Sequence, residues 1–348
     1  MSLPRTLFVG IGASGPAWYR AALPATALGA DWVGVRGTPP ELRFVTGDNG
    51  RVRALEDLFG YDVVVVQQVR GREWVALIRD LQARGTRVLY EIDDLLDAVR
   101  KTAGHEHAQA FDRRWVVASE MAMRVCDGVI CSTEFLARRY ASVNPDVHVC
   151  RNGLDLRRYD LTRLPRETVT IGWAGGAGHE AAMKPWLPAV REVLRALPHA
   201  RFMTVGAPYA ELLEPEFGPE RAIALPFGQI ETYPAAMSNF DVALAPAAPT
   251  NFFRAKSDLR WLEASALGIP VVADPGVYPD VEHGVTGLHA ATPAEAAEHL
   301  LALARSRELR EAIGAAARDI VSRTRRIEVA AEQWRAVLET AVATGVAA

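Results

Sequence analysis

Charged residues that could perform chemistry are concentrated in Asn251–Asp274, which reads NFFRAKSDLRWLEASALGIPVVAD. The leucine spacing predicts an amphipathic helix that opens at Lys256 and carries Glu263 two turns later. A glycine and a proline then end the helix before a buried strand. A cation beside the free N–H groups of a helix start favours a bound anion, and a carboxylate can accept hydroxyl groups. This stretch therefore predicts a site for an anionic ligand that carries hydroxyls.

Length and composition limit the classes of protein to consider. A chain of 348 residues exceeds what one hydrophobic core usually holds, so we expect two domains of roughly 150 to 200 residues. Hydrophobic residues make up 49% of the chain, which is enough to fill two cores. The formal net charge of -3 argues against a dedicated binder of nucleic acid. We therefore expect small-molecule partners.

The cysteines and the N-terminus indicate the compartment. Cys126, Cys131 and Cys150 have neither zinc spacing nor the even number typical of a disulfide framework. The N-terminus enters a strand without a signal-peptide pattern, and no apolar run approaches the ~18 residues of a membrane span. We expect a cytoplasmic protein without stable membrane insertion, and a peripheral contact with a membrane-bound acceptor stays open.

The first half of the chain alternates between apolar runs and helical patterns. Residues 62–68 (DVVVVQQ) and 87–92 (RVLYEI) are β-branched and apolar without alternation, as in parallel strands buried on both faces. The short strand before them ends in GIGASG, where Gly12 and Gly15 let backbone approach a ligand. A plain tight turn explains these glycines equally well.

A second series of strands and helices begins near residue 168. The strand TVTIGWA leads into a turn that contains Gly176, and further strands follow before a helical tail with Trp334. We therefore expect an α/β fold with two doubly wound domains, 1–155 and 156–325. A last helix within 326–348 is expected to pack back toward the first domain.

Acidic residues follow the predicted strand at 87–92. Glu91, Asp93 and Asp94 would lie at the carboxyl end of the sheet, where ligands of such folds bind. A helix N-cap and an acceptor-binding role both fit them, and a DxD-like metal site is a weaker fit because no further ligands accompany the pair. His105 and His107 fall in a polar loop, either as surface residues or as sugar contacts.

Several segments together resemble retaining GT-B glycosyltransferases of the family 4 type. The passages DGVICSTEFLARRY and VHVCRNGLDLRRY resemble the family's motif at the end of the first domain, with Arg151 in place of the usual proline. KSDLRWLEASALGIPVVAD resembles its donor-site segment, and YEIDDLLD is similar to an acidic segment in one branch. The resemblance implies two Rossmann-like domains that face a cleft.

The resemblance also implies a donor, a UDP-, GDP- or dTDP-linked sugar, as co-substrate and no other cofactor or metal. Carried over by position, Glu263 would accept the ribose hydroxyls, and Lys256 with Arg254 would face the diphosphate. Its place after the predicted strand, and not the resemblance, makes Asp93 a candidate catalytic residue on the acceptor side. The remaining residues that the resemblance implies for donor binding are Gly12, Gly15, Gly176, His179, Lys184, Phe227, Gly228 and Ser257.

Our hypothesis is front-face transfer with retention, in which the leaving phosphate takes the acceptor proton. Fixed cations aimed at the leaving oxygen would stabilise the charge that develops there. One departure concerns Ala255, which stands where the family has a glutamate that contacts the donor sugar.

Three other functions stay open from the sequence. A nucleotide-sugar 2-epimerase uses a similar two-domain fold. Ala255 is compatible with a degenerate binding protein, and the local basic pair Arg113 and Arg114 with a transferase acting on modified nucleic acid.

Overall fold

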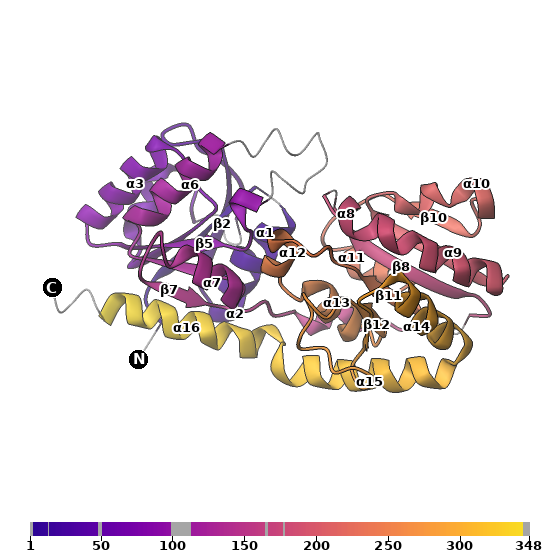
Figure 1. Cartoon of the computed structure of the whole chain (residues 1–348). Coiled ribbons are helices and arrows are strands. Elements are labelled where there is room, and N and C mark those ends of the chain that lie inside the picture. Colours follow the sequence, from indigo (N-terminus) through magenta and orange to yellow (C-terminus); the bar gives the residue numbers. More distant parts are fainter. Residues whose placement is uncertain are drawn as a thin grey trace.

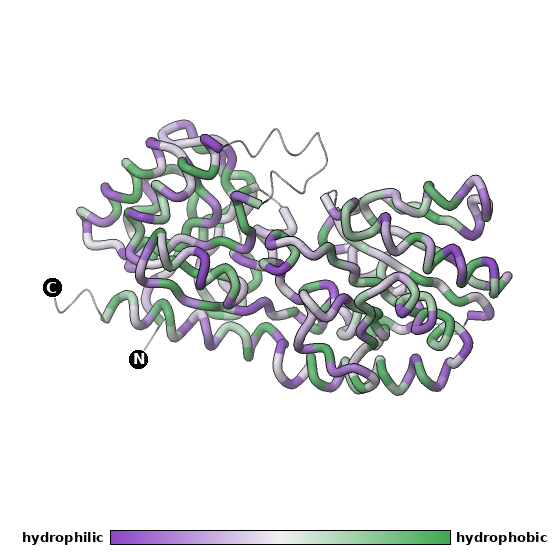
Figure 2. Tube along the Cα trace, viewed as in Figure 1, coloured by the Kyte–Doolittle hydropathy of each residue, from purple (hydrophilic) through white to green (hydrophobic). Residues whose placement is uncertain are grey.

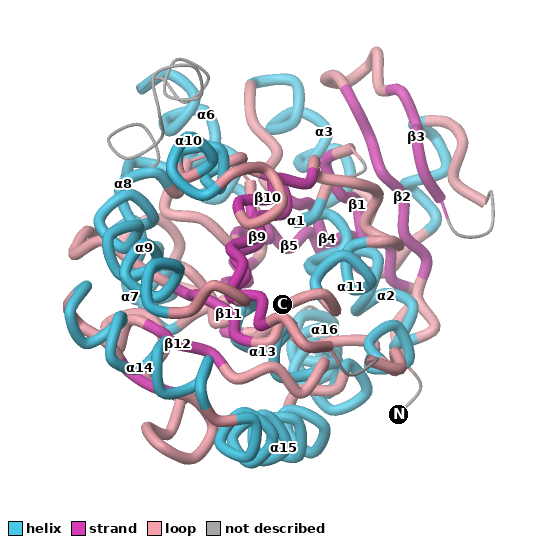
Figure 3. The backbone as a smooth tube through the Cα atoms, turned by 90° about the vertical axis from the view of Figure 1, so that its right-hand side faces the viewer, coloured by secondary structure: helices cyan, strands magenta, loops and turns pink. Residues whose placement is uncertain are grey.

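Two β-sheets lie at the centres of two lobes that stand side by side (Figure 1). The computed structural model describes residues 3–12, 14–47, 51–98, 113–163, 166–176 and 178–343. Viewed along the long axis, most strands lie inside with helices around them, and one end of the first sheet reaches the edge of the view (Figure 3). Hydrophobic and hydrophilic residues alternate along the covering helices, as expected for helices with one buried face (Figure 2).

The first sheet has seven strands in the order β3-β2-β1-β4-β5-β6-β7, and only the β2–β3 pair is antiparallel. Strands β2 and β3 lie on one side of β1, and strands β4 to β7 lie on the other side. The boundary between β1 and β4 is therefore the switch point, at which ligands bind in doubly wound folds. Its strands are β1 (Thr6–Ile11), β2 (Asp31–Arg36), β3 (Arg43–Gly47), β4 (Val63–Gln67), β5 (Arg87–Ile92), β6 (Gly128–Cys131) and β7 (Val147–Val149).

Helices cover this sheet on both faces. Strands β4 and β5 are almost wholly buried, which explains why their sequences lack polar alternation. The helical segments are α1 (Gly15–Ala17), the π-helical turn η1 (Trp18–Ala22), α2 (Leu23–Leu28), η2 (Leu55–Gly60), α3 (Arg72–Ala83), α6 (Arg113–Val125) and α7 (Glu134–Tyr140).

The second sheet is parallel throughout, in the order β10-β9-β8-β11-β12-β13, with its own switch point between β8 and β11. Its strands are β8 (Val169–Gly175), β9 (Ala200–Gly206), β10 (Ala222–Leu225), β11 (Val242–Ala245), β12 (Val271–Ala273) and β13 (Leu288–His289). The helical segments here are η3 (Leu156–Tyr159), α8 (Glu180–Met183), η4 (Lys184–Trp186), α9 (Leu187–Ala196), η5 (Tyr209–Leu212), α10 (Glu214–Phe217), α11 (Tyr233–Met237), α12 (Asn251–Ala255), α13 (Leu259–Ala266), α14 (Pro293–Arg305) and α15 (Arg307–Thr324).

The chain then crosses back to the first lobe as α16 (Ile327–Ala343), which runs beneath that lobe in Figure 1. Trp334 on this helix is 1% exposed, and its ring meets Phe8 of β1 edge-to-face at 5.5 Å between centroids. The guanidinium of Arg20 lies over the same indole, 4.8 Å from its centroid. The last helix is therefore part of the first-domain core.

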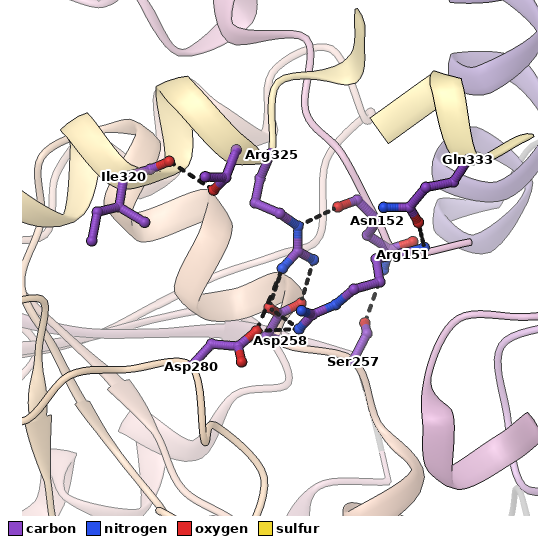
Figure 4. A network of polar contacts seen from close by, with 9 residues as sticks. Arg151, Asn152, Ser257, Asp258, Asp280, Ile320, Arg325 and Gln333 are labelled. Carbon is purple, nitrogen blue, oxygen red and sulfur yellow. Dashed lines mark hydrogen bonds and ion pairs between the residues drawn. The ribbon is translucent and has the colours of Figure 1, made fainter. Parts of the chain in front are cut away.

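A network of ion pairs joins the two domains where α15 ends (Figure 4). We call Arg151, Asp258, Asp280 and Arg325 the latch. Arg325 donates two hydrogen bonds to Asp258, at 2.7 and 2.8 Å, and a third at 3.0 Å to the carbonyl of Asn152. Arg151 reaches Asp258 at 3.3 Å and also pairs with Asp280. Asp258 precedes α13, so the latch fixes the start of that helix.

Candidate active site

A cavity of about 300 Å³ lies between the domains, beyond the carboxyl ends of both sheets. Gly15, at the start of α1, and Asp93, directly after β5, contribute to it from the first domain. Its second-domain lining includes the following predicted donor-site residues: Gly176, His179, Phe227, Lys256, Ser257 and Glu263. Residues predicted from distant parts of the sequence thus share one cleft at the two switch points.

Glu263 lies on the cleft-facing side of α13 and is 3% exposed. Its carboxylate accepts a hydrogen bond of 2.5 Å from the hydroxyl of Tyr19, which comes from the first domain. The hydroxyl oxygen of Tyr159 lies 3.3 Å from that of Tyr19. Burial raises the pKa of Glu263 to about 7, although the bond from Tyr19 and the charge of Arg260 act in the opposite direction. Glu263 thus carries an acceptor group that changes charge near neutral pH.

Lys256 lies between two helices, whereas the sequence predicted it at the start of one. Residues 251–255 form α12, whose N-cap is Thr250, and α13 begins only at Leu259. The Lys256 ammonium makes an ion pair with Asp94 across the cleft and lies 4.4 Å from the centroid of the Phe252 ring. The lysine is therefore fixed at the domain boundary.

Arg260 supplies a second cation to the cleft. Its Nε donates to the carbonyl of Ala174 at 3.0 Å, and its guanidinium lies 5.2 Å from the centroid of the Trp173 ring. A Cβ atom at Gly175 would lie 2.8 Å from the guanidinium and 3.0 Å from the indole, so only glycine leaves room for this arrangement. The glycine turn after β8 thus places a cation as well as open backbone.

Three acidic residues at the end of β5 have different surroundings. Asp93 lines the cleft and accepts a hydrogen bond of 2.5 Å from Gln68. Burial, with the neighbouring charge of Asp94, raises the pKa of Asp93 to about 6. Glu91 is wholly buried and pairs with Arg20 at 2.6 Å, which does not support the prediction that it faces an acceptor. It points into the domain because it belongs to the strand itself.

The structure separates other predicted residues from the cleft. Lys184 pairs with Glu180 on the same helical turn and is half exposed, and Arg254 is exposed on α12. Neither residue lines the cavity, nor do Gly12 and Gly228, although each precedes or follows a lining residue closely. These placements do not support direct contact of the four residues with the donor, which stays a prediction. His105 and His107 lie outside the described residues.

His179 lines the cavity and has an unusual nitrogen. Its Nδ1 is buried and has no hydrogen-bond partner among the described residues. Burial, and then the charges of Arg260 and Lys256, lower the pKa of His179 well below its ordinary value, so the ring is neutral. A neutral imidazole can donate or accept, and a buried polar atom without a partner is a position that a ligand could satisfy.

A polar chain connects the cleft to the first-domain core. Asn152 lines the cavity and donates to Ser257 Oγ at 2.9 Å. The carbonyl oxygen of the Asn152 side chain accepts from Arg20 at 2.9 Å. Neither Asn152 nor Tyr19 was predicted from the sequence as a site residue. Tyr19 had only one local signal, its position one helical turn after the GIGASG turn.

No group of three or more His, Cys, Asp and Glu residues in the described part of the chain could hold a metal ion. Within the same part, the helices are too short or too polar to span a bilayer.

Comparison with known proteins supports the architecture. Residues 187–336 match a family model described as Glycosyl transferase-like. Sucrose-phosphate synthase from Thermosynechococcus elongatus aligns over 98% of this chain and 100% of its own, with a TM-score of 0.69 and 15% identity. HepE from Anabaena, solved with UDP and glucose, aligns over 97% of this chain and 100% of its own, with a TM-score of 0.68 and 16% identity.

A glycosyltransferase from Rickettsia africae aligns over 97% of this chain and 98% of its own, with a TM-score of 0.65 and 14% identity. A search of curated proteins found no match. The prediction of an α/β protein with GT-B architecture is therefore confirmed, and so is the predicted likeness to glycosyltransferases.

Proposed function

We propose that the protein transfers a sugar from a nucleoside-diphosphate donor to a hydroxyl group of an acceptor, with retention and without a metal ion. The observation that carries this proposal is the convergence of Lys256, Arg260 and Glu263 on one interdomain cavity. Two fixed cations beside one hydroxyl-binding carboxylate match the charge pattern of a nucleoside diphosphate. The structure of HepE with UDP and glucose, a protein of the same fold, adds support.

Each part of the donor has a matching group. The diphosphate would replace Asp94 as the partner of Lys256 and would also meet Arg260, a planar donor suited to phosphate oxygens. Ribose hydroxyls would replace Tyr19 at Glu263. Phe227 and Tyr233 stack at 5.3 Å between centroids beside the cavity and offer an apolar face to a base. UDP-, GDP- and dTDP-linked sugars are the candidate donors.

The transfer exchanges one bond at the anomeric carbon for another. The bond from that carbon to the diphosphate oxygen breaks, and a bond to the acceptor oxygen forms. The acceptor proton moves to the leaving diphosphate, whose negative charge Lys256 and Arg260 would stabilise. Asp93, at the first-domain side of the cavity, would accept a hydrogen bond from the acceptor hydroxyl and orient it.

A thermal-shift screen with UDP, GDP and dTDP tests donor binding. A ligand at ~100 times its dissociation constant adds about 2.7 kcal/mol of stability, so a matching nucleotide gives a clear shift. Release of the nucleoside diphosphate from the corresponding UDP-, GDP- or dTDP-sugar then tests catalysis. The absence of a shift with every nucleotide would contradict the proposed donor site.

A nucleotide-sugar-binding protein without activity is the second candidate, and Ala255 favours it. Ala255 is wholly buried among first-domain core residues, and its carbonyl accepts a bond of 3.2 Å from Thr133. It does not line the cavity. Slow hydrolysis of a bound nucleotide sugar would decide for the enzyme, and tight binding without turnover would decide for the binding protein.

A further inference from the structure

Gln68 has an unusual backbone conformation. Its φ is +47°, and it is the only non-glycine residue with a positive φ in the described ranges. Left-handed backbone costs a residue with a side chain roughly 1 to 2 kcal/mol compared with ordinary conformations. Gln68 follows directly after β4, and its backbone N–H donates to the carbonyl of Glu91 at 3.0 Å. A glycine would adopt this conformation without the cost.

The turn directs consecutive glutamines to different partners. Gln67 is 2% exposed and bridges the end of β1 to α1, since it accepts from the N–H of Ile11 at 3.3 Å and donates to the carbonyl of Pro16 at 2.9 Å. Gln68 instead donates through Nε2 to Oδ1 of Asp93 at 2.5 Å. The left-handed residue is therefore the one whose side chain holds the carboxylate at the cleft.

The charges around Asp93 explain why a neutral donor suits this place. Asp94 and Glu91 face Asp93 with like charge, and Lys256 and Arg20 face it with opposite charge. A cation at position 68 would compete for the carboxylate as a full ion pair. The amide N–H of Gln68 fixes Oδ1 of Asp93 without adding charge. Oδ2 of Asp93 has no hydrogen-bond partner among the residues that the structure describes.

We propose that Gln68 is a positioning residue for acceptor binding: it holds Asp93 through Oδ1 so that Oδ2 can accept a hydrogen bond from the acceptor hydroxyl. This inference rests on the proposed function, because it needs Asp93 to orient the acceptor. Gln68 combines this left-handed backbone directly after β4 with a side chain that reaches Asp93 directly after β5.

The bond from Gln68 also affects ionisation. It lowers the pKa of Asp93, against burial and the charge of Asp94, which raise it. Loss of this bond should raise the pKa further. Because an ionised Asp93 is the better acceptor, the acidic limb of the rate profile should then move to higher pH.

The test compares Gln68→Gly, Gln68→Asn and Asp93→Asn with the unmodified protein. UDP-glucose, GDP-glucose and dTDP-glucose are supplied in turn, water serves as the acceptor, and nucleoside diphosphate release is measured across pH. Glycine removes both the strain and the amide, and asparagine tolerates the backbone but is one methylene shorter. We expect both position-68 variants to keep or gain thermal stability, to retain the thermal shift with the nucleotide selected in the screen, and to lose about tenfold in rate.

A double variant separates positioning from packing. If Gln68 acts through Asp93, Gln68→Gly should cause no further loss in the Asp93→Asn background. Unchanged rates and pH profiles in Gln68→Gly would overturn the inference, as would equal losses with and without Asp93. If the unmodified protein releases nucleoside diphosphate and Gln68→Gly does so equally, only this inference fails. If the unmodified protein releases none from any donor, the proposed function fails with it.

Discussion

Polar contacts join the two domains in the latch and across the cleft, and these two sets of contacts differ in the number of hydrogen bonds that each partner makes. In the latch, Arg325 is 8% exposed at its side chain and meets Asp258 through two nitrogens. Across the cleft, Lys256 meets Asp94 through single atoms, and Tyr19 meets Glu263 through one hydroxyl. Both cleft contacts border a cavity, and the latch residues do not.

We infer from this difference that the latch and the cleft contacts have different roles, although both consist of charged and hydrogen-bonding groups. A buried charge pair with two good hydrogen bonds is strongly destabilising when one partner is removed. Single contacts beside a cavity can pass to a ligand that offers the same groups, a phosphate for Asp94 and a hydroxyl for Tyr19. We therefore expect the latch to determine stability and the cleft contacts to determine binding and rate.

The largest expected effect is on stability, from Arg325→Met. This change leaves Asp258 buried with only Arg151, so we expect the free energy of unfolding to fall by about 3 kcal/mol. Urea denaturation measures it. Arg318→Met is the matched control, because the Arg318–Asp160 pair is exposed and should contribute less than about 1 kcal/mol. Equal losses in the two variants would remove the distinction drawn for the latch.

The second effect is on rate, from Lys256→Ala. Loss of a cation at the leaving oxygen should lower turnover by about 100-fold or more, by analogy with removal of one oxyanion donor. Lys184→Ala serves as the control, since Lys184 pairs with Glu180 outside the cavity and should leave turnover unchanged. Steady-state release of nucleoside diphosphate gives both values. Intact turnover in Lys256→Ala would show that the cleft contact is structural.

The sequence predicted the strands that are buried on both faces and failed for those with mixed character. The runs DVVVV and RVLYEI were predictable because parallel strands covered by helices need no polar residues. The antiparallel pair β2 and β3 was missed, because β2 is buried only over its second half and β3 is an edge strand that contains arginine, threonine and glycine. The bridge-like strand β13 has only two residues, too few for a periodic signal.

The site was predictable where it is local and not where it depends on domain docking. Lys256 and Glu263 share one short segment, so their spacing placed them together. Their partners Asp94 and Tyr19 are 162 and 244 residues away, respectively, and no local pattern couples them. Similarly, Glu91 and Asp93 are two residues apart in sequence, but only the end of β5 decides that one is buried and the other reaches the cleft.

The third effect is on the pH dependence of binding. The pKa of Glu263 is raised to about 7 from an ordinary 4.5, so its carboxylate becomes protonated as pH falls through 7 and no longer accepts ribose hydroxyls well. We expect the dissociation constant of UDP, or of the nucleotide selected in the screen, to rise about tenfold from about pH 8 to about pH 6. Calorimetry measures the dissociation constant at each pH. Glu263→Gln is the control, because the nucleotide itself titrates in the same way with both proteins and its contribution cancels in the comparison. Parallel pH profiles in the two proteins would argue against Glu263 as the titrating group.

The same carboxylate should affect stability in the opposite direction. Its folded-state pKa lies above its ordinary value, so between about pH 4.5 and 7 the folded state binds a proton that the unfolded state does not. The contribution of Glu263 to stability therefore increases as pH falls through 7 and is lost as pH rises. The difference between the unmodified protein and Glu263→Gln, measured by urea denaturation at each pH, isolates this contribution.

The smallest effect is expected from Tyr19→Phe. The variant removes the hydroxyl that donates to Glu263 but keeps the ring in place. The free energy of unfolding should therefore fall by only about 1 kcal/mol. Because ribose hydroxyls are proposed to take over this bond, nucleotide affinity should stay equal or increase, whereas loss of a permanent contact would weaken it. Calorimetry and urea denaturation on the same preparation give both quantities. A drop in affinity of more than about tenfold, or 1.4 kcal/mol, would mean that Tyr19 holds Glu263 in the bound state as well, and the cleft contact would then resemble the latch.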